Sequence, residues 1–254
     1  MRTSSRNFAV LLFDEVELLD VASLMQVASL AGRHYNWRPF RLLPVARAAG
    51  LVDTRSQLRL EAKFSFEDCP APELLFVPGG YGARRAADDA SAVEWCRKVA
   101  PGLTLTLAIG AGVAVLGAAG LLDGASVATT SDTRAWLAGN LANTRLDEPE
   151  PIVATLDGKL LTAASSGHGL ELALAMVERQ LGKKLAAAVR TQLGAVAVAA
   201  RDGNRRQHRR ASSFGHVIAE RGGDDRVGSG RQVRSVLLGG ADRDESDQIG
   251  RAHV

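Results

Sequence analysis

The chain has 254 residues, of which 46% are hydrophobic and 23% charged, a balance typical of a globular protein with one large α/β domain or two small ones. Its net charge of +3 arises in residues 201–254, which hold 11 Arg and 8 acidic residues, since residues 1–200 hold 20 basic and 20 acidic residues. The neutral body lacks the electrostatic footprint of a nucleic-acid-binding protein, so we expect no nucleic acid as a partner.

Strands and helices alternate in the first hundred residues. A continuous apolar run predicts a buried strand at 8–13, and further strands are predicted at 40–45 and at 74–77, which is short and buried. Apolar residues at helical spacing predict helices at 18–31, which Gly32 would end, and at 90–99. Between them, 51–62 alternates apolar and polar residues, which is typical of a half-exposed hairpin.

The segment LTLAIGAGVAVLGAAGLLDG, residues 105–124, predicts a strand, a tight turn and a helix. Leu105–Ile109 is apolar, the turn runs through Gly110-Ala111-Gly112, and the apolar helix ends near Gly120. Many α/β enzymes carry their nucleophile on such an elbow. The turn is not a dinucleotide fingerprint, because the G-x-G-x-x-G spacing is absent and the turn does not follow the first strand. It contains only Gly and Ala, so it offers backbone groups and no reactive side chain.

The second half of the chain continues the alternation. The remaining elements are predicted at 126–130 (strand), 132–137 (helix), 152–156 and 159–163 (strands), and 169–180 and 184–193 (helices). The last two strands flank Asp157-Gly158, a strong hairpin signal. The sequence therefore predicts an α/β fold of the flavodoxin-like, doubly wound type, with a mostly parallel sheet and helices on both faces.

Small residues follow three of the predicted strands. These segments are Pro78-Gly79-Gly80, Gly110-Ala111-Gly112 and Thr129-Thr130-Ser131. Ligands of doubly wound sheets bind outside the carboxyl ends of the strands. The convergence of the three segments predicts a binding site at that edge of the sheet.

The last part of the chain differs from the rest in composition. Residues 196–254 are rich in Arg, Gly, Asp and Ser and lack apolar periodicity, so we expect the folded domain to cover 1–195 and the tail to be disordered. The final residues, 249–254, have the sequence that a common sequencing adapter yields on translation. A frameshift or adapter artefact is therefore the alternative explanation of the tail.

The cysteines and the first residues bear on the compartment. Cys69 and Cys96 have no metal-ligand spacing, which indicates reduced thiols in a cytoplasmic protein without a metal site. The apolar run near the start is too short for a signal peptide or a membrane span, so we expect no membrane partner. The excess of Arg over Lys and the abundance of Ala and Gly indicate a GC-rich bacterial gene.

Four segments resemble the ThiJ/PfpI superfamily in their order and spacing, over roughly residues 7–193. They read LLFDEVELLDVASLMQV, LLFVPGGYGAR, AAGLLDGASVATT and DGKLLTAASSGHGLELALAMVERQLG. The superfamily comprises class I glutamine-amidotransferase-like proteins, including DJ-1 proteins, isonitrile hydratases and the N-terminal domains of some AraC-type regulators. The resemblance implies the flavodoxin-like fold predicted above, and a homodimer.

The resemblance also locates three catalytic positions. The superfamily's elbow carries a Cys ten residues before the Gly of AGLL, and that position is Gly110 here. Its His follows the ATT segment, where this chain has Ser131. Its acidic partner, in the first turn of the first helix, corresponds to Asp20. One of the three chemical groups is therefore retained, and no catalytic set is intact.

Several residues have both a functional and a plain structural interpretation. Asp20 either holds a ligand or proton, or caps the first helix. The backbone N–H groups of Gly79, Gly80, Gly110 and Ala111 either remain as an anion-accepting pocket or serve a tight turn. Ser131 is either a weak polar contact or a residue at the end of a strand. His168 is either a substitute base or an exposed loop residue.

Three functions remain open. The first is a non-catalytic or altered-activity member of the superfamily that binds an unknown small molecule, with no cofactor, through Asp20, Gly79, Gly80, Gly110, Ala111 and Ser131. The second is a hydratase, glyoxalase-like or amidase-type enzyme that uses Asp20 and His168 as displaced groups. The third is a truncated AraC-type regulator, since a chain broken near residue 200 would have lost its helix-turn-helix domain.

Overall fold

The computed structural model describes residues 5–33, 38–140, 144–146, 151–194 and 201–202. All of these residues belong to one compact unit, Met1–His208, and the second unit, Arg209–Val254, lies outside them. The predicted tail, 196–254, therefore also lies outside the described residues apart from 201–202, and its domain boundary stays a prediction. No helix in the described ranges is long and apolar enough to cross a membrane.

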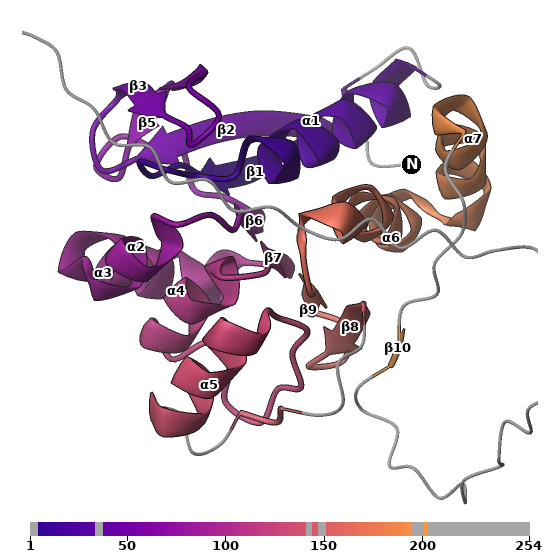
Figure 1. Ribbon diagram of the computed structural model, residues 1–254. Helices are drawn as coiled ribbons and strands as arrows, with labels where there is room; N and C mark the ends of the chain where they lie inside the picture. The colour runs from indigo at the N-terminus through magenta and orange to yellow at the C-terminus, as the bar shows by residue number, and fades with distance from the viewer. Residues whose placement is uncertain (1–4, 34–37, 141–143, 147–150, 195–200, 203–254) are drawn as a thin grey trace, which may run out of the picture. The chain divides into compact units, whose positions relative to one another are not determined.

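An eight-stranded sheet forms the centre of the domain, with the strand order β10-β8-β9-β7-β6-β1-β2-β5 (Figure 1). The strands are β1 (Arg6–Leu11), β2 (Phe40–Ala46), β5 (Phe64–Ser65), β6 (Leu74–Val77), β7 (Leu105–Ile109), β8 (Ile152–Thr155), β9 (Leu160–Ala163) and β10 (Arg201–Asp202). All neighbours pair in parallel except β8 and β9. The hairpin β3 (Gly50–Asp53) and β4 (Arg59–Ala62) forms a separate two-stranded sheet. The mostly parallel, doubly wound sheet predicted from the sequence is confirmed.

Helices cover both faces of the sheet (Figure 1). One face carries α1 (Leu18–Arg33), α6 (Gly169–Leu181) and α7 (Lys183–Leu193). The other carries α2 (Ala83–Asp88), α3 (Ala90–Val99), α4 (Gly112–Ala118) and α5 (Ser131–Asn140). Short 3₁₀ turns, η1 (Ala100–Gly102) and η2 (Ser166–His168), precede β7 and α6. The helix that follows β1 therefore lies on one face of the sheet and the helices that follow β6 lie on the other. The winding direction of the fold switches between these two neighbouring strands.

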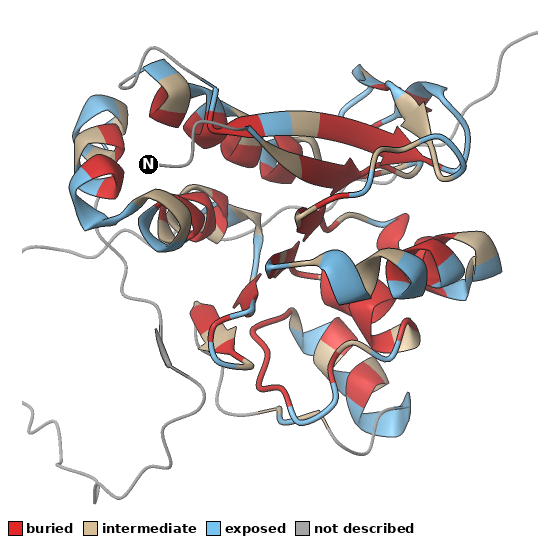
Figure 2. Ribbon diagram, turned by 180° about the vertical axis from the view of Figure 1, so that it is seen from behind, coloured by how far each residue is buried: buried red, intermediate tan, exposed pale blue. Residues whose placement is uncertain are grey.

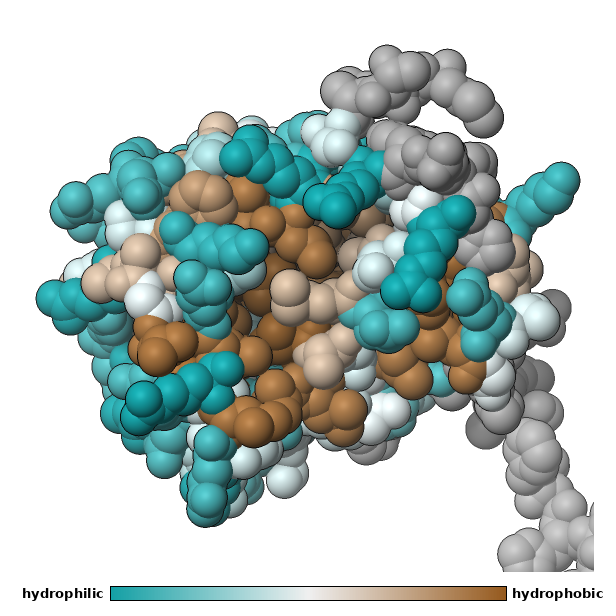
Figure 3. Space-filling view, turned by 90° about the horizontal axis from the view of Figure 1, so that it is seen from above, coloured by the Kyte–Doolittle hydropathy of each residue, from teal (hydrophilic) through white to brown (hydrophobic). Residues whose placement is uncertain are grey.

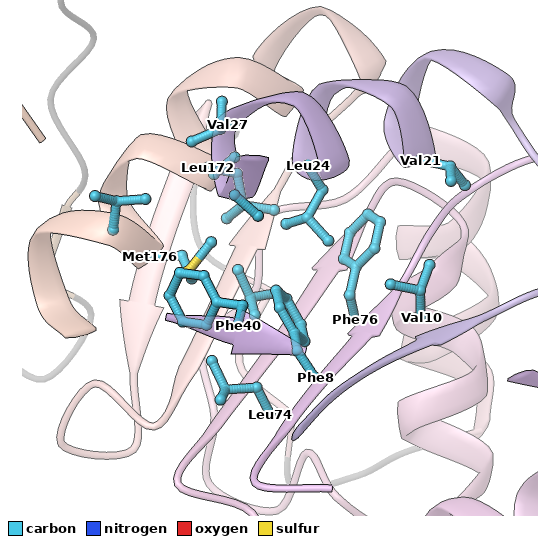
Figure 4. Packing of buried hydrophobic residues seen from close by; sticks show 14 of the residues in the cluster. Phe8, Val10, Val21, Leu24, Val27, Phe40, Leu74, Phe76, Leu172 and Met176 are labelled. Atoms are coloured by element: carbon cyan, nitrogen blue, oxygen red, sulfur yellow. The ribbon is translucent and has the colours of Figure 1, made fainter. Parts of the chain in front are cut away.

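Two apolar clusters, one on each face, make up the core. Along β1, Phe8 and Val10 face the α1 side while Ala9 and Leu11 face the α4 side, as the period of two in a strand requires. Figure 4 shows the first cluster, in which Phe8, Val10, Leu24, Phe40, Phe76 and Met176 gather between α1, α6 and the sheet. The central strands are buried along most of their length (Figure 2). Burial on both faces explains why these strands are apolar without alternation.

Most elements lie where the sequence predicts them. The strands at 74–77 and 105–109 and the helix at 90–99 match to the residue, and 51–62 and 152–163 form the two predicted hairpins. Three boundaries differ. The first helix continues through Gly32 to Arg33, α2 was not predicted, and β1 ends two residues earlier and β2 one residue later than predicted. The turn that joins β8 to β9, residues 156–159, is centred on Asp157-Gly158 as predicted.

The predicted strand at 126–130 is wrong. Only Ser126 forms an isolated bridge, with Arg145, and the next residues are bound by side chains instead of a ladder. The Ala128 N–H donates to Thr162 Oγ1 at 2.8 Å, and Thr129 Oγ1 donates to the Gly110 carbonyl at 2.6 Å. Threonine suits a strand by propensity, but here the hydroxyls compete with backbone pairing.

Candidate functional site

The turn between β7 and α4 is a sharp elbow at the carboxyl end of the sheet. Gly110 has φ +51°, a left-handed conformation that disfavours residues with a Cβ. Its N–H donates to the Ala163 carbonyl at 2.8 Å, which ties the elbow to the end of β9. A methyl group on Gly112 would lie 2.4 Å from the Val77 carbonyl oxygen, so α4 can start this close to β6 only with glycine there. The sequence-predicted elbow is therefore present in its geometry.

The elbow has room for a side chain that the sequence does not supply. A Cβ on Gly110 would lie 3.5 Å from Thr130 Cγ2 and 3.7 Å from the Ala164 carbonyl oxygen, which are ordinary contacts. The hydrogen bond from the Thr129 hydroxyl fixes the Gly110 carbonyl. Position 110 thus has space for a side chain but carries no reactive group.

Asp20 lies fully buried in the first turn of α1. The Gly79 N–H donates to its Oδ2 at 2.7 Å, while Oδ1 has no hydrogen-bond partner. Burial raises the pKa of Asp20 to about 6, against the lowering effects of the Ser166 hydroxyl and the Gly79 N–H, and with a smaller raising effect of Glu17. The Ser166 hydroxyl is close enough to lower this pKa, although it does not meet hydrogen-bond geometry with the carboxyl, so Oδ1 is left without a partner.

The two glycines after β6 connect Asp20 to the elbow. A Cβ on Gly79 would lie 3.0 Å from both Asp20 Oδ2 and the Ile109 carbonyl oxygen, and 3.6 Å from the Ala111 nitrogen. Gly80 has φ +120° and forms a bridge with Val16, where a methyl group would lie 2.4 Å from the Glu15 carbonyl oxygen. The backbone of Gly79 is therefore wedged between the buried carboxyl and the elbow, and a larger residue would separate them.

The structure brings some of the predicted site residues together and leaves others apart. Asp20, Gly79, Gly110 and Ala111 adjoin one another, as the contacts above require. Gly80 faces the loop around Val16 instead of the carboxyl.

Ser131 is exposed at the first position of α5, and its neighbour Thr130 is the residue that lies against Gly110. His168 is half-buried, with Nδ1 3.1 Å from the Ser165 hydroxyl.

Sequence reasoning missed Ser166 as a site residue, and it placed Thr129 and Thr130 at this edge of the sheet without giving either a role. Ser166 approaches Asp20 from η2, Thr129 binds the elbow carbonyl, and Thr130 lies over position 110. The signal for Ser166 was its place after the strand that neighbours β7, because carboxyl ends of adjacent parallel strands meet at one edge. The individual contacts of the two threonines were missed because 126–130 was predicted as a strand.

Neither cysteine supplies the missing nucleophile. Burial raises the pKa of Cys96 to about 12, and burial together with the Asp68 charge raises that of Cys69 to about 11. Both thiols are therefore protonated at neutral pH and unreactive. Among the described residues, no three His, Cys, Asp or Glu side chains gather as metal ligands would.

Three hollows lie elsewhere on the domain. They have volumes of about 1000, 320 and 430 Å³ and lie between α1 and β2, at the carboxyl ends of β1 and β2, and beside β8 and α6. None of the three is lined by Asp20 or Gly110. Asp20 itself has no exposed surface, while the elbow residue Ala111 and the neighbouring Ser166 and Thr130 are half-buried.

Comparison with known proteins gives matches over most of the domain. Residues 6–179 match the DJ-1/PfpI family. The isonitrile hydratase of Pseudomonas putida is 31% identical over 186 residues, which cover 72% of this chain and 75% of that protein.

Two solved structures show the same fold. A ThiJ/PfpI family protein from Pseudomonas syringae superimposes with a TM-score of 0.67 at 21% identity, covering 83% of this chain and 80% of the other. An AraC family transcriptional regulator from Pseudomonas putida has a TM-score of 0.63 at 25% identity, covering 74% of this chain and 99% of the other.

Proposed function

Because the chain belongs to the DJ-1/PfpI family, we propose that its α/β domain binds a small molecule at the elbow and does not perform covalent chemistry on it. The observation that carries this proposal is Gly110. It occupies the apex of the elbow in a left-handed conformation, with space for a side chain and none present. Covalent catalysis at this apex needs a thiol, hydroxyl or amine, and glycine has none.

Asp20 supports a binding role. A buried carboxyl oxygen without a partner costs free energy, which a ligand that donates a hydrogen bond would recover. Because its pKa is about 6, the ionisation of this carboxyl changes near neutral pH and would respond to a ligand bound beside it. The ligand therefore carries an N–H or O–H group directed at Oδ1, and binding moves Ser166 aside.

The test measures turnover and, separately, the accessibility of the elbow. Isonitriles, the substrate class in the name of the Pseudomonas putida relative, are offered to the wild-type protein and to Gly110→Cys. We expect no hydration of isonitriles by the wild type. In Gly110→Cys, iodoacetamide should label the new thiol only when position 110 opens to solvent, so the labelling rate reports how often it opens. Wild-type turnover that disappears in Asp20→Asn or His168→Gln would contradict the proposal and favour an enzyme with displaced catalytic groups. His168, in contact with the Ser165 hydroxyl, is the candidate base of such an enzyme.

A second candidate is the sensing domain of a transcription regulator. The AraC family regulator structure supports it, because 99% of that chain aligns with this domain at 25% identity. The test is the genomic sequence downstream of codon 194, followed by a DNA-binding assay on its product. A helix-turn-helix segment in the same reading frame would favour this function, and a stop codon there would exclude it.

A further inference from the structure

A groove of about 1000 Å³ lies between α1 and the outer edge of β2, apart from the elbow. Met25 and Ala28 of α1 and Phe40, Leu42 and Pro44 of β2 form its apolar floor. Figure 3 looks down on this side of the domain and shows an apolar hollow bordered by hydrophilic side chains. Exposed apolar hollows with polar borders mark binding surfaces.

The border of this groove is basic. Arg33, Arg38, Arg41 and Lys63 line it, all four are exposed, and no Asp or Glu is among the described residues that line it. None of the four forms an ion pair within the described part of the chain. The groove therefore combines an apolar floor with four uncompensated positive charges.

The same groove contains unpaired backbone groups. Pro39 and Val45 accept hydrogen bonds from Arg6 and Leu12 near β1, at 2.9 and 2.7 Å, so the odd-numbered residues of β2 face β1. The even-numbered residues consequently face outward. Lys63 donates to the Pro44 carbonyl and β5 pairs only with Val45 and Ala46, which leaves the outward-facing backbone groups of Phe40 and Leu42 without a strand partner among the described residues.

We propose that the groove docks an extended acidic segment of another protein, which adds as a strand to the outer edge of β2 at Phe40–Leu42. The added strand would satisfy the free backbone groups, and every second side chain would point towards the α1 side of the sheet. Apolar side chains on that side would cover Met25, Ala28 and Leu42, while Asp or Glu at the alternate positions and ends would meet the basic border. Strand addition supplies affinity and the charges supply selectivity.

Other occupants account for fewer of these features. A second copy docking through the same face would bring the basic border against itself, because a two-fold interface uses one patch twice. A fatty-acid anion would fill the floor and meet one cation but would leave the edge of β2 unpaired. The C-terminal residues of this chain, 201–254, hold more basic than acidic residues and lack the required charge.

The probe is a fluorescent, end-capped peptide of about six residues that alternates Glu and Val, long enough to span the free edge of β2. Anisotropy measured on the full chain should show saturable binding that weakens as salt is added. Two matched peptides separate the contributions. The Lys–Val counterpart tests charge, and the Glu–Val peptide N-methylated at alternate residues tests the backbone hydrogen bonds. We expect both to bind at least roughly tenfold more weakly.

The protein variant Arg38→Glu/Arg41→Glu should weaken binding of the Glu–Val peptide by roughly tenfold or more and reduce its salt dependence. The matched control, Lys98→Glu/Lys184→Glu, makes the same charge change at exposed positions outside the groove and should bind like the wild type. Equal binding of the N-methylated peptide would overturn strand addition. A change of oligomeric state in Arg38→Glu/Arg41→Glu, or saturable binding of a fatty acid with no binding of the peptide, would overturn the proposal as a whole.

Discussion

At the scale of single residues, Asp20 makes the stability of the folded protein depend on pH. Its pKa of about 6 exceeds the ordinary value of 3.8, so between these two pH values the unfolded chain is ionised while the folded protein still holds the proton. The free energy of unfolding therefore falls as pH rises from 3.8 to 6 and is unaffected by this group below that window.

Replacing this carboxyl should remove the effect. In Asp20→Asn, the loss of stability between about pH 4 and pH 7 should be smaller than in the wild type by roughly 2–3 kcal/mol, from the linkage between pKa and folding. Urea titrations at the two pH values measure it, with the exposed Asp123→Asn as control for the loss of one charge. Parallel pH profiles for wild type and Asp20→Asn would show that Asp20 ionises freely in the folded protein.

Three glycines of the elbow region distinguish backbone strain from steric overlap. Gly110 and Gly120 both have positive φ and open surroundings, so each substitution by Ala should cost about 1 kcal/mol through backbone conformation. Gly112 lacks the positive φ, but its Cβ would meet the Val77 and Pro78 carbonyl oxygens at 2.4 and 2.5 Å, so Gly112→Ala should cost roughly 2–3 kcal/mol. Denaturant titration of the three variants checks this order, and a larger cost for Gly110→Ala than for Gly112→Ala would refute it.

At the scale of elements, the segment before α5 is held to the elbow by side chains. Thr129→Val keeps the shape but removes the donor to the Gly110 carbonyl, which should lower the free energy of unfolding by roughly 1–2 kcal/mol. Thr104→Val, which removes a 3.0 Å bond from an exposed hydroxyl, is the matched control and should cost less. Equal costs for the two variants would mean that the elbow carbonyl finds another partner.

The sequence predicted elements well where burial alone determines them. β6 is uniformly apolar and β7 is apolar apart from Thr106 because both faces are covered, and α3 begins at the Asp89 cap, which accepts from the Ser91 N–H at 2.9 Å. Prediction failed where tertiary contacts outweigh local preference. α2 is a six-residue helix, too short for its apolar residues to show a helical repeat, and it begins directly after Gly82. The elbow and Asp20 could be predicted from spacing, whereas the approach of Ser166 depends on strand neighbours that spacing does not encode.

At the scale of the whole molecule, the expected homodimer remains a prediction. The exposed large apolar side chains of the described residues include Leu51 and Leu58 of the β3–β4 hairpin and Tyr81, over which Arg55 lies at 3.7 Å. Such side chains favour an interface at the hairpin.

Sedimentation equilibrium should therefore show a dimer for the wild type and a shift towards monomer for Leu51→Ser/Leu58→Ser. The basic groove lies on a different set of residues, so Arg38→Glu/Arg41→Glu should leave the dimer intact. A monomeric wild type at tens of micromolar concentration would rule the dimer out.

The open position at the elbow has a consequence in the genetic code. Two of the four glycine codons, GGT and GGC, differ from a cysteine codon and from a serine codon by a single base, and the scaffold at Gly110 already leaves space for either side chain. The backbone cost of such a change, about 1 kcal/mol for a left-handed residue, is small beside the stability of an ordinary domain. From a GGT or GGC codon, a single point mutation would place a thiol at the apex of the elbow, and selection for a new activity could begin from there.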